Sequence, residues 1–232
     1  MNSNQKNTAL LVFSLSAEQE VRRKSIFGHN AKKENSAFFN LLIKQTKELA
    51  ANSGVDVFWV DEHQQQGVDF GTRFSNAFQN IFDAGYENVV SIGNDCPDLS
   101  VEVLNDAIQK LERNNLVFGP TQDGGVYLLG INKIAFEQQQ LVNLLWQTSK
   151  LRSSIECYAD SNNFTFDALS TFIDLDTEQD VQYYAKYNSS SLLSRFYKAV
   201  IALLKRTFKN FIPTIPCTPK YSHVGLRAPP TV

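Results

Sequence analysis

Short apolar runs of strand length alternate along this chain with amphipathic stretches of helix length, and this alternation limits the fold more than any other feature of the sequence. Such alternation is typical of βαβ units, in which a helix connects two parallel strands. The pattern therefore predicts an α/β fold with a mostly parallel sheet. The expected strands are residues 9–13, 55–60, 87–92, 116–119 and 126–131, with a short strand from residue 172, and the expected helices are residues 36–52, 70–84 and 101–111, a weaker helical region at 133–163 and a helix after Thr177.

The charge of the chain is divided unevenly between its two parts. Residues 1–180 contain 14 Lys and Arg against 24 Asp and Glu, whereas residues 181–232 contain 8 Lys and Arg and no acid. A basic tail can indicate an anionic surface or partner, although the acidic body argues against nucleic-acid binding. We therefore expect one domain at residues 1–189, followed at residues 190–232 by a basic amphipathic helix and an extended, proline-rich tail.

The three cysteines, Cys96, Cys157 and Cys217, are far apart and lack the C-x-x-C spacing of redox and zinc sites. No apolar stretch approaches the roughly 18 residues that a membrane span needs. The apolar run at residues 9–13 is also too short for the core of a signal peptide. These features predict a cytoplasmic protein, with peripheral attachment to the inner membrane face left open.

That attachment would depend on the two-faced helix predicted at residues 192–211. On a helical wheel of about 100° per residue, its apolar side chains fall in one half and its basic side chains in the other. Such a helix can lie on an anionic membrane, or it can pack its apolar face on its own domain or on a second copy. Peripheral membrane contact and a homodimer through residues 190–211 are therefore both open.

Carboxylates follow the third predicted strand, at the place where ligands bind in open α/β sheets. Asp95 and Asp98 lie in one tight loop there. Two carboxylates in such a loop can bind a hard divalent cation, but an aspartate can equally cap the next helix. The spacing alone leaves both interpretations open.

Two more carboxylate clusters follow later strands. Asp123 lies in the segment Gly119-Pro-Thr-Gln-Asp-Gly-Gly125, which is either an ordinary hairpin turn or a place where glycines let a substrate approach the backbone. Asp174 and Asp176 follow the short strand from residue 172, and capping is the simpler role for this pair alone.

In combination, these clusters resemble a known bacterial family. The resembling segments are Gln66-Gly-Val-Asp-Phe-Gly-Thr-Arg-Phe74, Asp95-Cys-Pro-Asp-Leu99, Gly119-Pro120 with Asp123-Gly-Gly125 and Tyr127-Leu-Leu-Gly130, and Asp174-Leu-Asp-Thr-Glu-Gln-Asp180. Their order resembles the DUF2064 family of glycosyltransferase-like proteins in the nucleotide-diphospho-sugar transferase superfamily, across roughly residues 9–185. More distantly, the chain is similar to the molybdenum-cofactor and phospholactate guanylyltransferases. The resemblance implies a GT-A fold, a three-layer α/β/α arrangement.

The resemblance also implies roles for particular residues. A Mg or Mn ion would bridge the phosphates of a sugar nucleotide, and a carboxylate would act as general base on an acceptor hydroxyl. The implied residues are Asp95, Asp98 and Asp176 for the metal, Asp69, Arg73 and Asp95 for the nucleotide, Asp123 for the base, and Gly124, Gly125 and Trp146 for the substrate.

One segment departs from the family pattern. Where the family has a glycine-containing, basic loop after the first strand, this chain has residues 14–25, with no glycine before Gly28. Ser14, Arg22 and Lys24 are still candidates for nucleotide binding, but close approach of a phosphate to the backbone is disfavoured.

These observations favour a metal-dependent glycosyltransferase that uses a nucleotide-sugar donor and an unidentified hydroxyl acceptor. The departure in the first loop counts against the alternative, a nucleotidyltransferase acting on a phosphorylated acceptor. A catalytically silent protein that binds a nucleotide sugar, or serves as a scaffold, is the third hypothesis.

Overall fold

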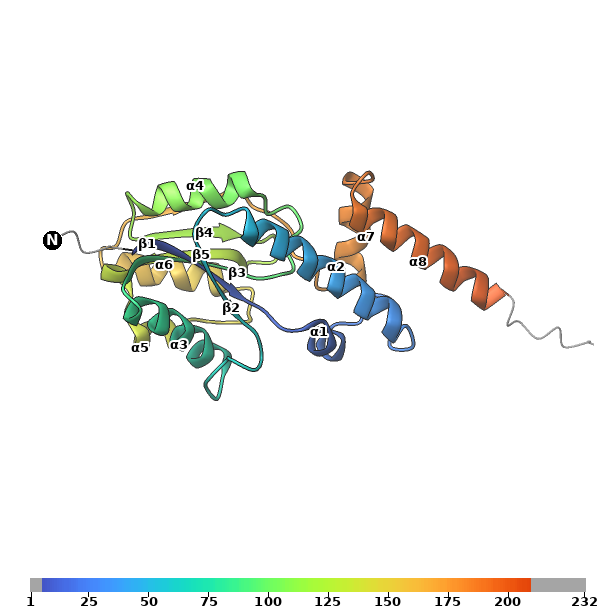
Figure 1. The fold of residues 1–232 in the computed structure, drawn as a ribbon, viewed down its shortest axis with the longest axis horizontal. Helices are drawn as coiled ribbons and strands as arrows, with labels where there is room; N and C mark the ends of the chain where they lie inside the picture. The colour runs from blue at the N-terminus through green and yellow to red at the C-terminus, as the bar shows by residue number, and fades with distance from the viewer. Residues whose placement is uncertain (1–5, 210–232) are drawn as a thin grey trace, which may run out of the picture.

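Six strands form one sheet in the order β2-β1-β3-β5-β4-β6 in the computed structural model, which describes residues 6–209 (Figure 1). Strand β5 runs antiparallel to both of its neighbours, whereas every other pair in the sheet is parallel. The prediction of an α/β fold with a mostly parallel sheet is therefore confirmed. The strands are β1 (Lys6–Phe13), β2 (Asp56–Val60), β3 (Tyr86–Ile92), β4 (Leu116–Pro120), β5 (Val126–Asn132) and β6 (Phe166–Ala168).

The helices predicted at residues 36–52, 70–84 and 101–111 and after Thr177 form close to those positions. Asp69 caps α3, Ser100 caps α4 and Thr177 caps α7, each by accepting a hydrogen bond from a backbone N–H of the first turn. The helices are α1 (Ala17–Arg23), α2 (Lys32–Ala51), α3 (Phe70–Asp83), α4 (Val101–Leu111), the 3₁₀ turn η1 (Lys133–Ala135), α5 (Gln138–Val142), α6 (Leu151–Ser161), α7 (Glu178–Tyr187) and α8 (Leu192–Lys209).

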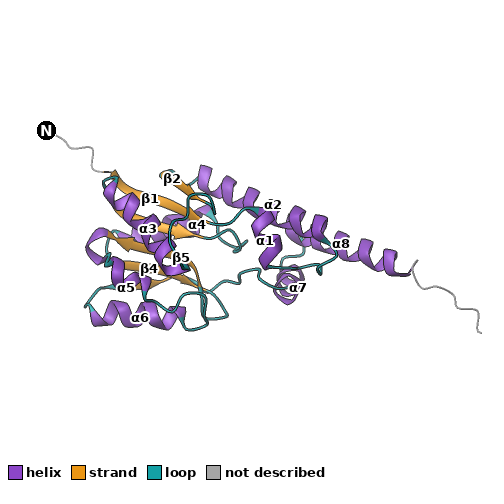
Figure 2. Ribbon diagram, turned by 90° about the horizontal axis from the view of Figure 1, so that it is seen from below, coloured by secondary structure: helices purple, strands orange, loops and turns teal. Residues whose placement is uncertain are grey.

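Helices cover both faces of the sheet, so that three layers form (Figures 1 and 2). Apolar residues of α3, α5 and α6 pack against one face, around Leu11, Phe118 and Leu129. Residues of α4 and the end of α2 pack against the other face, around Leu10 and Val90. The alternating side chains of the central strands are therefore buried on both faces, as expected for a mostly parallel sheet.

A separate apolar cluster joins the helices that extend beyond the sheet. It contains buried residues of α1, α2, α7 and α8, and Leu175 from the segment before α7. Phe27, between α1 and α2, makes edge contact with Phe38 of α2 and stacks on Tyr197 of α8, with ring centroids 5.7 Å apart in both pairs. We call this group the helical core, since no strand contributes to it.

The structure differs from the sequence-based expectation at three places. Helix α1 and strand β6 were not expected, and the short strand expected from residue 172 is reduced to a single bridge between Phe172 and Thr121. The proline-rich tail, Cys217 and the last two residues of the helix expected at 192–211 lie outside the described residues.

No helix within residues 6–209 is both long enough and apolar enough to cross a membrane. Helix α8 buries Leu193, Tyr197 and Val200 in the helical core. Lipid or dimer contact through this helix stays a prediction.

Candidate functional site

Lys24 lies between two carboxylates at the carboxyl edge of the sheet. Its ammonium nitrogen is 3.0 Å from Oδ2 of Asp95, 2.5 Å from Oδ1 of Asp176 and 3.8 Å from Oε2 of Glu20. Lys24 ends helix α1, Asp95 follows β3, and Asp176 precedes α7. A backbone hydrogen bond of 2.9 Å, donated by Leu175 to the carbonyl oxygen of Asp95, holds the last two segments together.

The local fold of α1 explains how Lys24 reaches this place. Ser16 caps the helix, and both its backbone N–H and its hydroxyl donate to the carboxylate of Glu62, at 2.8 and 2.5 Å. Gln65, in the same loop after β2, donates its side-chain amide to the carbonyl oxygen of Ser14 at 3.0 Å. The loop after β2 therefore holds the first turn of α1 in place, and the last turn directs Lys24 to the carboxylates.

The charged groups of this cluster shift one another's pKa. Although burial disfavours the charged amine, Asp95, Glu20 and Asp176 raise the pKa of Lys24. Burial also opposes ionisation of Asp95, but the ammonium of Lys24 holds the pKa of this carboxyl below its ordinary value. Lys24 and Asp95 are therefore both charged near neutral pH.

Asp174, unlike Asp95, has no cationic partner within residues 6–209 that stabilises its charged form. Burial, followed by the negative charges of Asp95, Asp123 and Asp176, raises the pKa of Asp174 to about 7. Its side chain forms neither an ion pair nor a hydrogen bond with any other residue in the described part of the chain. Asp174 is therefore a pocket carboxyl that is partly protonated near neutral pH.

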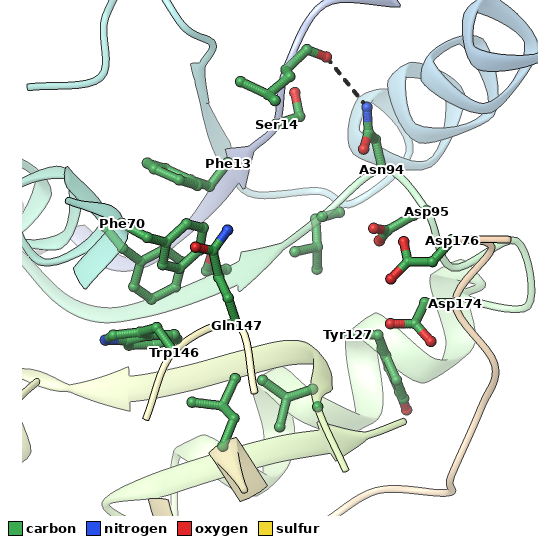
Figure 3. Close-up of a pocket in the computed structure, with 18 of the residues that line it drawn as sticks. Phe13, Ser14, Phe70, Asn94, Asp95, Tyr127, Trp146, Gln147, Asp174 and Asp176 are labelled. Carbon is green, nitrogen blue, oxygen red and sulfur yellow. Dashed lines mark hydrogen bonds between the residues drawn. The ribbon is translucent and has the colours of Figure 1, made fainter. Parts of the chain in front are cut away.

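The charged cluster forms one end of a pocket of about 750 Å³. Figure 3 shows Asp95, Asp174 and Asp176 pointing toward one another on one side of this pocket, and Phe13, Phe70 and Trp146 on the other. The volume is in the range of small-molecule and cofactor sites. A ligand that fills this pocket would meet charge at one end and aromatic rings at the other.

The aromatic end is closely packed. Phe70 stacks on Phe74 at 5.7 Å, and Trp146 lies 4.7 Å from Phe74 and 5.4 Å from Phe70 between ring centroids. The indole N–H of Trp146 donates to the carbonyl oxygen of Leu141 at 2.8 Å. Gly71 permits this packing, because a Cβ there would overlap the indole ring and the carbonyl oxygen of Val142.

The structure brings most of the predicted site residues to this pocket. Those that line it are Ser14, Lys24, Arg73, Asp95, Asp123, Gly125, Trp146 and Asp176. Four others lie outside its walls. Arg22 is exposed and pairs with Glu18, Asp69 caps α3, Asp98 lies in the loop before α4, and Gly124 packs against the backbone of Ser149.

Asp123 is engaged within its own turn. Its Oδ1 accepts hydrogen bonds from the hydroxyl of Thr121 at 2.5 Å and from the backbone N–H of Gly125 at 3.0 Å. These bonds fix the orientation of the carboxylate at the pocket wall.

Several lining residues were not among the predicted site residues. Asp174 had a signal in the sequence, because it belongs to a pair of aspartates after an expected strand. Phe70, Phe74 and Tyr127 lie in segments that resemble the family pattern, although that pattern gave them no role. The lining residues without a predicted role include Phe13, Glu20, Arg23, Gln65, Phe70, Phe74, Asn94, Tyr127, Gln147 and Asp174.

A family comparison identifies the chain. The sequence profile of the DUF2064 family, described as an uncharacterised protein conserved in bacteria, matches residues 32–148. The chain belongs to the DUF2064 family. The matched range includes Asp95, Asp123 and Trp146, but Lys24, Asp174 and Asp176 lie outside it. No curated protein matches the sequence.

Solved structures show that this DUF2064 protein has the fold of nucleotide-diphospho-sugar transferases. A candidate nucleotide-diphospho-sugar transferase from Desulfovibrio desulfuricans G20 has a TM-score of 0.73 and 22% identity, over 86% of this chain and 97% of that chain. A 4-diphosphocytidyl-2C-methyl-D-erythritol synthase from Anaerococcus prevotii DSM 20548 has a TM-score of 0.50 and 11% identity, over 80% of this chain and 96% of that chain.

Asp95 and Asp176 are chemically suited to a divalent cation. Carboxylate oxygens are the preferred ligands of Mg²⁺, and the ammonium of Lys24 already marks a position between the two carboxylates that a cation occupies. Within residues 6–209, however, no three His, Cys, Asp or Glu side chains are arranged together as a metal site. An ion held by Asp95 and Asp176 would need a substrate or water for its remaining ligands.

Proposed function

We propose that this DUF2064 protein is a glycosyltransferase that binds a nucleotide-sugar donor in the pocket and transfers the sugar to a hydroxyl acceptor. The observation that most supports this proposal is the position of Lys24 between Asp95 and Asp176 at the carboxyl edge of the sheet. In open α/β folds, this edge is where ligands bind. A cationic side chain there provides charge for a diphosphate, and the carboxylates can hold a divalent ion.

Different residues of the pocket would bind the leaving diphosphate and accept the proton of the acceptor. Asp95 and Asp176 would hold a Mg or Mn ion, which would supply charge neutralisation for the leaving diphosphate, only if Lys24 left its position between them. Lys24 would then bind the diphosphate together with Arg23. The proton of the acceptor hydroxyl would pass to Asp123 or Asp174, which face the same pocket. Asp174 is the less constrained of these two carboxylates, since Asp123 is fixed by Thr121 and Gly125.

Nucleotidyl transfer is the second candidate function. The likeness of the fold to the diphosphocytidyl synthase favours it. The geometry around α1 counts against it, because the carboxylate of Glu62 accepts the N–H of Ser16 at the place where the family pattern has a glycine-containing loop. A bound triphosphate would have to compete with this carboxylate for the backbone donor.

Thermal unfolding with a panel of ligands tests the proposal. We expect UDP-, GDP-, ADP- or CDP-linked hexoses to raise the Tm of the native protein with Mn²⁺, because a ligand that binds only the folded state stabilises it. At about 100 times its Kd a ligand adds about 2.7 kcal/mol, or roughly 5–10 °C for a chain of this size. In Asp95→Asn, the part of the Tm increase that depends on Mn²⁺ should be lost. Asp160→Asn, on the exposed side of α6, should keep the full increase.

The outcomes separate the three hypotheses. Release of pyrophosphate from a nucleoside triphosphate would identify nucleotidyl transfer instead. If the affinity for the donor is the same with and without Mn²⁺ and in Asp95→Asn, and no donor is turned over, the chain is a binding protein. If no nucleotide or sugar nucleotide changes the Tm, all three hypotheses that involve a nucleotide are wrong.

A further inference from the structure

Gln147 has a backbone conformation that is unfavourable for its side chain. Its φ is +59°, in the left-handed region that glycine adopts easily and other L residues rarely adopt. Within the described residues, the other non-glycine residue with positive φ is Asn163, at +56°. Asparagine tolerates this region because its short polar side chain bonds locally, but glutamine has no such advantage.

Hydrogen bonds on both sides of Gln147 impose this conformation. Before it, the indole of Trp146 is held by Leu141, and the backbone N–H of Leu145 donates to the hydroxyl of Ser154 at 3.2 Å. After it, the hydroxyl of Thr148 donates back to the carbonyl oxygen of Leu145 at 2.8 Å. Glycine would satisfy the same backbone with less strain, so a larger residue here needs another explanation.

The side chain of Gln147 extends into the pocket (Figure 3). Its residue is exposed, and its amide forms no hydrogen bond with any other of the described residues. Gln147 follows Trp146 directly in sequence, and Figure 3 shows it on the same side of the pocket as Phe70 and Trp146. A free amide, which both donates and accepts, is thereby presented next to aromatic rings.

We propose that Gln147 is a ligand-binding residue whose amide hydrogen-bonds the polar edge of a ring that packs on Phe70 or Trp146. A nucleobase and a sugar ring share this chemistry, a flat or apolar face and an edge of donors and acceptors. The inference rests on the proposed function, because the ring belongs to the nucleotide-sugar donor. It deepens that function by assigning recognition of the ring to a residue outside the carboxylate motifs.

Substitutions at Gln147 separate its effect on folding from its effect on binding. Gln147→Gly should raise the Tm of the ligand-free protein by roughly 2–4 °C, because the left-handed backbone is no longer strained. The same variant should weaken ligand binding about tenfold, as expected for the loss of one well-placed hydrogen bond to the ligand. Gln147→Asn keeps an amide on a shorter side chain, so its affinity for the ligand should lie between those of the native protein and Gln147→Gly.

Asn163→Gly is the matched control, since it relieves the same backbone conformation between α6 and β6, outside the pocket walls. It should leave the affinity for the ligand unchanged.

Binding is measured by calorimetry with UDP-glucose, GDP-mannose, ADP-glucose and CDP-glucose, and with the four nucleoside diphosphates alone. If Gln147→Gly binds a nucleoside diphosphate alone more weakly than the native protein does, Gln147 contacts the nucleoside. If its affinity falls only for the probes that carry a sugar, Gln147 contacts the sugar. Both results support the inference.

Two results overturn the inference, and they differ in what else they overturn. If the native protein binds a probe and Gln147→Gly binds it equally well, Gln147 is not a ligand-binding residue, but the proposed function stands. If the native protein binds none of the eight probes, the inference and the proposed function are both wrong.

Discussion

The ring of Tyr127 occupies space that exists only because residue 119 has no side chain. A Cβ at Gly119 would overlap the ring atoms of Tyr127. Tyr127 cannot move away freely, since it stacks on Phe172 with centroids 5.0 Å apart and its hydroxyl donates to the carbonyl oxygen of Ser170 at 3.0 Å. Because Tyr127 also lines the pocket, Gly119 shapes a wall of the site without touching its interior.

We expect Gly119→Ala to lower the free energy of unfolding by about 1–3 kcal/mol, the usual cost of overpacking a buried site. Urea denaturation measures this change. In a Tyr127→Ala background, the same substitution should cost much less, because the ring that the new methyl group meets is gone. An equal cost in both backgrounds would mean that the overlap with Tyr127 is not the cause.

Helix α1 depends on a partner from a distant part of the chain. Its cap, Ser16, donates two hydrogen bonds to Glu62, which is 46 residues away. Although partial burial opposes it, these bonds lower the pKa of Glu62 below its ordinary value. Since α1 ends at Lys24, Glu62 positions the ammonium group without contacting the pocket.

This linkage predicts a difference in acid sensitivity. A carboxylate whose pKa is lowered by folding stabilises the protein above its unfolded pKa of about 4.5, and that stability is lost as the pH falls through the folded pKa. Glu62→Gln should therefore reduce stability at pH 7 and make the loss between pH 5 and pH 3 smaller, as measured by urea denaturation. Glu48→Gln, at an exposed and weakly paired position of α2, is the matched control for loss of one carboxylate. If stability plotted against pH for Glu62→Gln runs parallel to the plot for the native protein, the prediction is wrong.

The strands and longer helices could be predicted because each carries its own periodic pattern or cap. Strand β3 is a nearly continuous buried run, and α3 has Asp69 as its cap. Helix α1 has a local signal in Ser16, which caps it, but its seven residues are too few for a periodic pattern, and Ser16 is itself held by the distant Glu62. Strand β6 has three residues and pairs only with β4 in the described structure, so its local signal is weak.

The same distinction applies to the site. Asp95, Asp123 and Asp176 could be placed at one edge of the sheet because each follows an expected strand. Gln147 could not be identified, since a left-handed glutamine results from hydrogen bonds of its neighbours and not from a sequence pattern.

The pocket lies where the sheet meets the helical core. Asp95, after β3, and the aromatic end belong to the sheet and its covering helices, whereas Glu20, Arg23 and Lys24 come from α1, which packs in the helical core. A ligand that contacts both ends therefore connects two parts of the molecule that are packed around different apolar clusters.

This arrangement predicts a distant effect on α8. Within the described residues, α8 contributes nothing to the pocket walls, yet it packs on the same helical core as α1. We expect a saturating nucleotide-sugar ligand to slow amide hydrogen exchange in α8 by up to about 100-fold where exchange requires the helical core to open, because the ligand must dissociate first. Protection confined to residues that touch the ligand would show that the two parts open independently.

The hydrogen bond from Leu175 to Asp95 also determines when the site can form during synthesis. Lys24 and Asp95 are already 71 residues apart, and Asp176 lies still farther along the chain. Each contact between such distant residues closes a long loop, and contacts of high sequence separation slow folding. A nascent chain can therefore pair β1 with β2 and β3 well before Asp174 and Asp176 leave the ribosome, and it has no assembled charge cluster until they do.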